Sequence, residues 1–178
     1  MNLQRPIAPD PYELLPSTGS FELTSPGFSD GEDLPEKHSF GAENLSPALA
    51  WSGAPAGTKQ YVLSCYDPDA PTPSGFWHWF VAGIPAEATS VEEGAGHIGG
   101  GSLPRPALQL KNDFGTRDFG GAAPPPGDRA HRYMFAVHAL DVADLGLDAD
   151  TSPAKASFAM LEHVIARATL TGMFAVQD

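Results

Sequence analysis

Residues 67–79 read Asp67-Pro68-Asp69-Ala70-Pro71-Thr72-Pro73-Ser74-Gly75-Phe76-Trp77-His78-Trp79. The stretch combines two acids, a proline-rich turn and a histidine between two tryptophans. Apolar runs precede it at 61–66 and follow it at 80–84. Short apolar runs bounded by turn residues are typical of strands, so the region predicts a strand, a polar loop and a second strand.

The second of these strands predicts where its histidine points. Side chains alternate between the two faces of a strand. We therefore expect His78 to share a face with Phe80 and Ala82, and Trp77 and Trp79 to lie on the other face. A histidine at the start of an apolar strand, beside a loop with two acids, indicates a polar pocket at the end of a sheet.

Composition predicts one globular domain. The chain has 178 residues, of which 42% are hydrophobic, and its 19 glycines and 18 prolines indicate many turns rather than disorder. We expect an extended N-terminal arm over 1–20 and a single domain over 21–178. A net charge of −12 disfavours nucleic acid and anionic membrane surfaces as partners. The N-terminus has no apolar signal region, no stretch is long enough to span a membrane, and a cytoplasmic location is expected.

Periodicity predicts further elements. Short strands are expected at 21–24, at the end of 44–51 and at 108–110, and a longer one at 131–140. The longer strand places His131 and Tyr133 on one face. A C-terminal helix is expected to start at Thr151 or Ser152 and to end near Gly172. Its apolar stripe would consist of Phe158, Leu161, Val164, Ile165 and Ala168.

The sharpest candidate site combines two histidines. His78 and His131 each begin an apolar strand after a loop rich in proline or glycine. If the strands are neighbours, both imidazoles converge with the Tyr133 hydroxyl and with Asp67 and Asp69. Imidazole, phenol and backbone N–H groups around 120–121 are donors suited to a phosphate-type anion. In the alternative interpretation, the acids cap turns and backbone groups satisfy the histidines.

Other chemistries have weaker signals. Asp67, His78 and His131 could supply three metal ligands, but no His-x-His or Cys-x-x-Cys spacing supports a metal site. No Gly-x-Ser-x-Gly motif marks a nucleophile, so no catalytic residue and no cofactor are predicted. Arg132 should face away from His131 and pair with a structural acid.

Several motifs together resemble the phosphatidylethanolamine-binding protein (PEBP) family, and most closely its bacterial Raf-kinase-inhibitor-like branch. They are Asp-Pro-Asp-Ala-Pro at 67–71, Trp-His-Trp at 77–79, Gly-Gly-x-x-Pro-Pro-x-Gly at 120–127 and His-Arg-Tyr at 131–133. The resemblance runs from about residue 20 to the C-terminal helix. It implies a mostly β fold, in which a large central antiparallel sheet packs on a smaller sheet, with a C-terminal α-helix.

The resemblance also implies a small anion pocket that binds phosphate-bearing molecules or lipid head groups such as phosphorylethanolamine. By motif, its ligand-binding residues are Asp67, His78, His131 and Tyr133, with a wall formed by Asp69, Pro71, Gly121 and Ala122. Phe119 and Ala122 replace the tyrosine and proline that are usual in bacterial relatives, which predicts a more apolar mouth.

The resemblance leaves three functions open. The first is a ligand-binding or regulatory module without catalysis. The second is an inhibitor of a protein kinase or protease, because the family includes inhibitors of both kinds. The resemblance to bacterial members also implies a homodimer. The third is a weak hydrolase or metal-dependent enzyme that uses the same Asp/His pocket. Fold alone does not choose among them.

Overall fold

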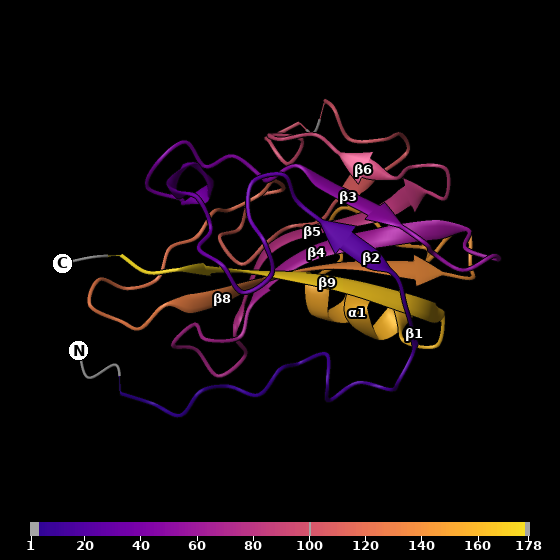
Figure 1. Cartoon of the computed structure of the whole chain (residues 1–178). Coiled ribbons are helices and arrows are strands. Elements are labelled where there is room, and N and C mark those ends of the chain that lie inside the picture. The colour runs from indigo at the N-terminus through magenta and orange to yellow at the C-terminus, as the bar shows by residue number, and fades with distance from the viewer. Residues whose placement is uncertain (1–3, 100, 177–178) are drawn as a thin grey trace.

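The computed structural model describes residues 4–99 and 101–176. It contains two β-sheets, one α-helix and a 3₁₀ turn (Figure 1). The larger sheet has the order β1-β9-β8-β4-β5-β7, and the smaller has the order β2-β3-β6. The strands are β1 (Gly19–Ser20), β2 (Glu22–Thr24), β3 (Leu49–Ser52), β4 (Gln60–Asp67), β5 (Phe76–Pro85), β6 (Ser90–Val91), β7 (Leu108–Gln109), β8 (His131–Leu140) and β9 (Val164–Phe174).

The predicted mostly β fold is confirmed. All pairings in both sheets are antiparallel except that of β1 with β9. The smaller sheet lies over one face of the larger one (Figure 1), and the apolar side chains between them form the main core. The strands expected at 61–66, 80–84 and 131–140 are β4, β5 and β8, which form the centre of the larger sheet.

The other face of the larger sheet is covered in two parts. The helix α1 (Pro153–Met160) packs over one part through a second apolar cluster, which includes Val62, Phe80 and Leu140. The chain from residue 4 to β1 runs past the same sheet (Figure 1), and the Tyr12 ring lies 5.8 Å from that of His138 on β8. No helix in the described part of the chain is long and apolar enough to cross a membrane.

The predicted faces of β5 are wrong at its start. A register shift lies between Cys65 and Tyr66 of β4, which pair with Trp79 and Trp77, so that β5 has one extra residue there. Trp77 therefore packs with Phe80 on the outer face, at a ring distance of 5.7 Å. His78 is this extra residue, and it interrupts the regular alternation of side chains between the two faces. His78 consequently lies on the face of Tyr133, with ring centroids 5.0 Å apart.

The predicted long helix is also wrong in its second half. The helix begins as expected, with Ser152 accepting a bond from the Lys155 N–H and Pro153 in the first turn, but it ends at Met160. Residues 164–174 form β9, whose side chains are alternately buried and more exposed. Its apolar residues fit either period, and pairing with the open edge of β8 decides in favour of a strand. A Cβ on Gly172 would lie 3.0 Å from Leu34, so this glycine allows close packing rather than ending a helix.

Candidate functional site

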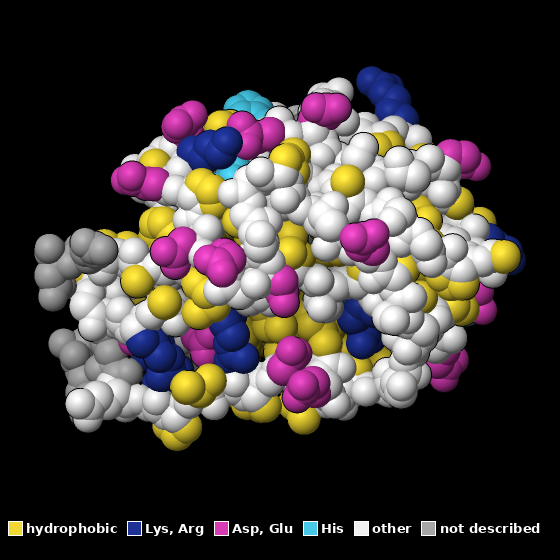
Figure 2. Space-filling model, in the orientation of Figure 1, with side chains coloured by type: hydrophobic (Ala, Val, Ile, Leu, Met, Phe, Trp, Pro, Cys, Tyr) yellow, Lys and Arg dark blue, Asp and Glu magenta, His cyan; other side chains and the backbone are white. Residues whose placement is uncertain are grey.

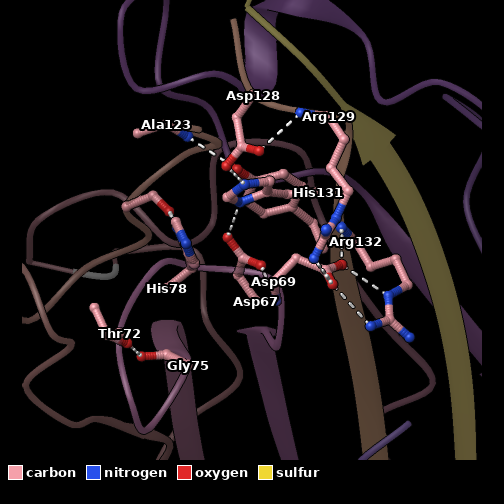
Figure 3. A network of polar contacts seen from close by, with 12 residues as sticks. Asp67, Asp69, Thr72, Gly75, His78, Ala123, Asp128, Arg129, His131 and Arg132 are labelled. Atoms are coloured by element: carbon pink, nitrogen blue, oxygen red, sulfur yellow. Dashed lines mark hydrogen bonds and ion pairs between the residues drawn. The ribbon is translucent and has the colours of Figure 1, made fainter. Parts of the chain in front are cut away.

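The site lies where the end of β4 meets the starts of β5 and β8 (Figure 3). Neighbouring antiparallel strands run in opposite directions, so the C-terminal end of β4 lies beside the N-terminal ends of both partners. Asp67 ends β4, His78 is the third residue of β5 and His131 begins β8. These three residues and Tyr133 are all buried, with exposed fractions of 3% or less.

His131 is held between two carboxylates. Its Nδ1 lies 2.7 Å from Asp67 Oδ2, and its Nε2 lies 2.9 Å from Asp128 Oδ2. Burial opposes protonation of the ring, but the two carboxylates outweigh burial and raise the pKa of His131. Two acceptors on opposite nitrogens suit an imidazolium, which donates from both. The two carboxylates therefore favour the positively charged form of His131.

The loop after β4 fixes the first of these carboxylates. The backbone N–H of Asp69 donates to Asp67 Oδ1 over 2.7 Å, which leaves Oδ2 for His131. An aspartate that accepts a bond from the residue two positions later is the usual Asx turn. The short Asp67-Pro68-Asp69 sequence thus orients the His131 ring.

His78 has the opposite electrostatic character. Its Nδ1 lies 2.7 Å from the Gly120 carbonyl oxygen and 3.1 Å from that of Gly121. Burial dominates and lowers the pKa of His78, so the ring is neutral with its proton on Nδ1. Nε2 then carries a lone pair, and within the described residues it has no hydrogen-bond partner. His78 is therefore a hydrogen-bond acceptor toward the site.

Tyr133 complements His78 with a donor. Its oxygen accepts a bond from the Ala123 N–H over 3.1 Å. Burial raises the pKa of Tyr133 well above its usual range, so the hydroxyl keeps its hydrogen. Within the described residues this hydrogen has no acceptor. A phenolic donor and an imidazole acceptor thus lie side by side.

Asp69 anchors the loop to two arginines. Arg132 donates to both carboxylate oxygens, from Nε over 2.8 Å and from Nη2 over 2.9 Å, and Arg129 Nη2 lies 3.6 Å away. Burial alone would raise the pKa of Asp69, but the hydrogen bonds from Arg132 outweigh it and lower that pKa. The expected pairing of Arg132 with a structural acid is confirmed. Asp69 is therefore fully engaged within the protein.

Two residues of the site were missed from the sequence. Asp128 lies in the loop before β8, and the Arg5 guanidinium is 2.8 Å from its Oδ2. The hydrogen bond from Arg5 contributes most to holding the pKa of Asp128 well below its usual range. Asp128 precedes His131 by three residues, which was an available signal. Arg5 lies more than 120 positions away in the sequence and had none.

Of the remaining predicted wall residues, two are buried and one is exposed. Gly121 packs so closely that a Cβ would lie 2.4 Å from the His38 carbonyl oxygen, and Ala122 beside it is buried. The Gly121 N–H donates to Asn44 Oδ1 over 2.7 Å, and the Gly120 N–H donates to the His78 carbonyl over 2.9 Å. These two N–H groups are therefore already used. Pro71 lies on the exposed side of its loop.

The polar network gathers several cationic groups around three aspartates. Asp67, Asp69 and Asp128 face the imidazolium of His131 and the guanidinium groups of Arg5, Arg129 and Arg132 (Figure 3 labels all of these except Arg5). Three carboxylates thus face four cations, in a chain with a net charge of −12. Within residues 4–99 and 101–176, no group of three or more His, Cys, Asp or Glu side chains is placed to hold a metal ion.

The chain resembles known proteins over most of its length. The family model for phosphatidylethanolamine-binding protein matches residues 24–175, which include the whole network except Arg5. The chain belongs to this family. Its similarity to the UPF0098 protein YbhB of Escherichia coli is 44% identity over 158 residues, 86% of this chain and 99% of the relative.

Solved structures of PEBP relatives have the same fold. The crystal structure of Escherichia coli YbcL, described as a new member of the mammalian PEBP family, has a TM-score of 0.86 and 42% identity. It covers 89% of this chain and 99% of that one. A putative PEBP homologue from Chlamydia trachomatis has a TM-score of 0.76 and 31% identity, over 88% and 98% of the two chains. Membership supports a small-ligand-binding protein of the PEBP kind.

Proposed function

We propose that this PEBP-family protein binds a small phosphate-bearing ligand, such as a phosphorylethanolamine-like head group, at the His78–Tyr133 pair. The observation that carries the proposal is the pairing of an unused donor with an unused acceptor. Tyr133 has a hydroxyl hydrogen to donate, and the neutral His78 has a lone pair at Nε2, with ring centroids 5.0 Å apart.

A singly protonated phosphate monoester matches this pair. Its anionic oxygen accepts from Tyr133, and its P–O–H group donates to His78. The cationic groups of the network favour the remaining negative charge. His131 contributes to this attraction when it is protonated, while Asp67 orients the His131 ring, and Gly121 and Ala122 form the wall. Regulation of a kinase or protease partner, a homodimer and a cytoplasmic location stay predictions from the resemblance.

Calorimetric titration tests the proposal. Wild-type protein is titrated with phosphorylethanolamine and with inorganic phosphate, and the Tyr133→Phe variant is compared with it. A hydrogen bond to a charged group contributes about 1.5–3 kcal/mol, so the variant should bind about 10- to 100-fold more weakly. Tyr61→Phe, the same change in the core between the sheets, is the matched control. Equal affinity in Tyr133→Phe and wild type would overturn the proposed contact.

A further inference from the structure

The N-terminal arm is fastened to the site by its backbone. The Arg5 carbonyl accepts a bond from Arg129 Nη1 over 2.8 Å, and the Ala8 carbonyl accepts one from Arg132 Nη2 over 2.7 Å. Farther along, Tyr12 stacks beneath the guanidinium of Arg167, 5.2 Å from the ring centroid. Figure 2 shows basic side chains gathered at the lower left of this face, where the arm runs in Figure 1. The arm therefore has a defined course that brings Arg5 to the network.

The side chain of Arg5 ends against two acceptors, the Asp128 carboxylate and the Asp69 carbonyl, and beside the His131 ring. Its Nη2 lies 2.8 Å from Asp128 Oδ2, bonds to the backbone carbonyl of Asp69 and lies 3.2 Å from His131 Nε2. The Asp128 side chain is only 3% exposed, whereas that of Arg5 is 22% exposed. With Arg5 in place the carboxylate is covered, and the guanidinium is the more exposed partner.

We propose that the Asp128 carboxylate and the Asp69 carbonyl form a cation subsite for alkylguanidinium groups, which Arg5 occupies in cis. An external alkylguanidinium competes with Arg5 for the same acceptors. A guanidinium suits the subsite because its N–H groups lie in one plane and can reach a carboxylate and a carbonyl together. The proposal concerns a cation and does not rest on phosphate binding at the His78–Tyr133 pair.

Removal of Arg5 should leave a vacant subsite that binds a guanidinium group. Asp128 would keep its bond to His131 but would lose the cation that satisfies its other interactions. A carboxylate that loses a hydrogen-bonded cation loses a charge-assisted contact, so a free guanidinium that restores the contact should bind. In the wild type, Arg5 is tethered at an effective concentration in the millimolar range or above. An external ligand must displace it and should bind more weakly.

Chemical rescue provides the test. The full-length Arg5→Ala variant is titrated with ethylguanidinium chloride in the millimolar range, followed by the NMR signals of His131. Saturable binding is expected, at least about 10-fold tighter than to the wild type. Ethylurea, which has a similar shape without the charge, should not bind. Arg117→Ala removes an arginine from an exposed pair with Asp150 and should behave like the wild type.

A second variant separates the subsite from general effects. Adding Asp128→Asn to Arg5→Ala should weaken ethylguanidinium binding at least about 10-fold, because the carboxylate is lost. Should Arg5→Ala fail to fold, Arg5→Gln allows the same titration. The proposal is overturned if the Arg5 variant binds no more tightly than the wild type, or if Asp128→Asn leaves its affinity unchanged. Phosphate titration of the same variants reports separately on the His78–Tyr133 pair.

Discussion

Replacing Asp67 by asparagine should lower the free energy of unfolding most at slightly acidic pH. An asparagine oxygen can still accept from His131 Nδ1, at present 2.7 Å from Asp67 Oδ2, but it carries no charge. Charge-assisted bonds contribute about 1.5–3 kcal/mol and neutral ones about 0.5–1.5 kcal/mol. The free energy of unfolding at pH 6 should therefore fall by about 1–2 kcal/mol.

The pH dependence provides a sharper signature of the same interaction. The pKa of His131 is raised in the folded protein, so its stabilising effect is complete below the unfolded pKa near 6.5 and is lost as pH rises through the folded pKa. The pKa values of His38, His78 and His138 are lowered in the folded protein. These three histidines therefore change the stability only at pH values below about 6.5. Wild-type stability should hence decrease as pH rises above about 6.5, by at most about 1.4 kcal/mol per pH unit.

Urea unfolding at several pH values measures both effects. In Asp67→Asn the decrease above pH 6.5 should be shallower, since one of the two carboxylates that favour the imidazolium is gone. Asp141→Asn is the control, because Asp141 pairs with His163 on the surface, where ion pairs contribute about 0–1 kcal/mol. If Asp67→Asn shows the full wild-type decrease, His131 is not a buried imidazolium and our account of the network is wrong.

Three further changes test other parts of the structure. Burial lowers the pKa of His138 to about 3, so unfolding by acid should set in as pH falls below about 6.5; in His138→Asn, circular dichroism should show a lower acid midpoint. Gly121→Ala should lower the free energy of unfolding by about 1–3 kcal/mol in thermal denaturation, because its Cβ would meet the backbone at 2.4 Å; Gly41→Ala, with nothing within 4 Å, should change it little. Arg132→Lys keeps the charge but loses the two-pronged contact with Asp69, and urea unfolding should show a loss of about 1 kcal/mol or more, whereas equal stability would mean that a single point charge suffices.

Much of the site was predictable because its residues belong to local patterns. The Asp67–Asp69 turn and the starts of β5 and β8 are encoded by short runs of neighbouring residues. The bulge in β5 was not, since the alternation of apolar residues contains no mark of one extra residue. That bulge is what places His78 beside Tyr133. Strict alternation would have separated the donor from the acceptor.

The central strands, the turn after β4, the start of α1 and the family could all be predicted from the sequence. Each of these depends on residues close together in the chain, whose spacing sets which backbone conformation buries apolar groups. Tertiary structure decided that 164–174 is a strand, because the backbone groups that pair with this segment lie on β8 and β1, which only the folded chain brings beside it. It also decided that Arg5 meets Asp128 and His131, since a contact between such distant positions depends on the path of the whole arm across the folded sheet.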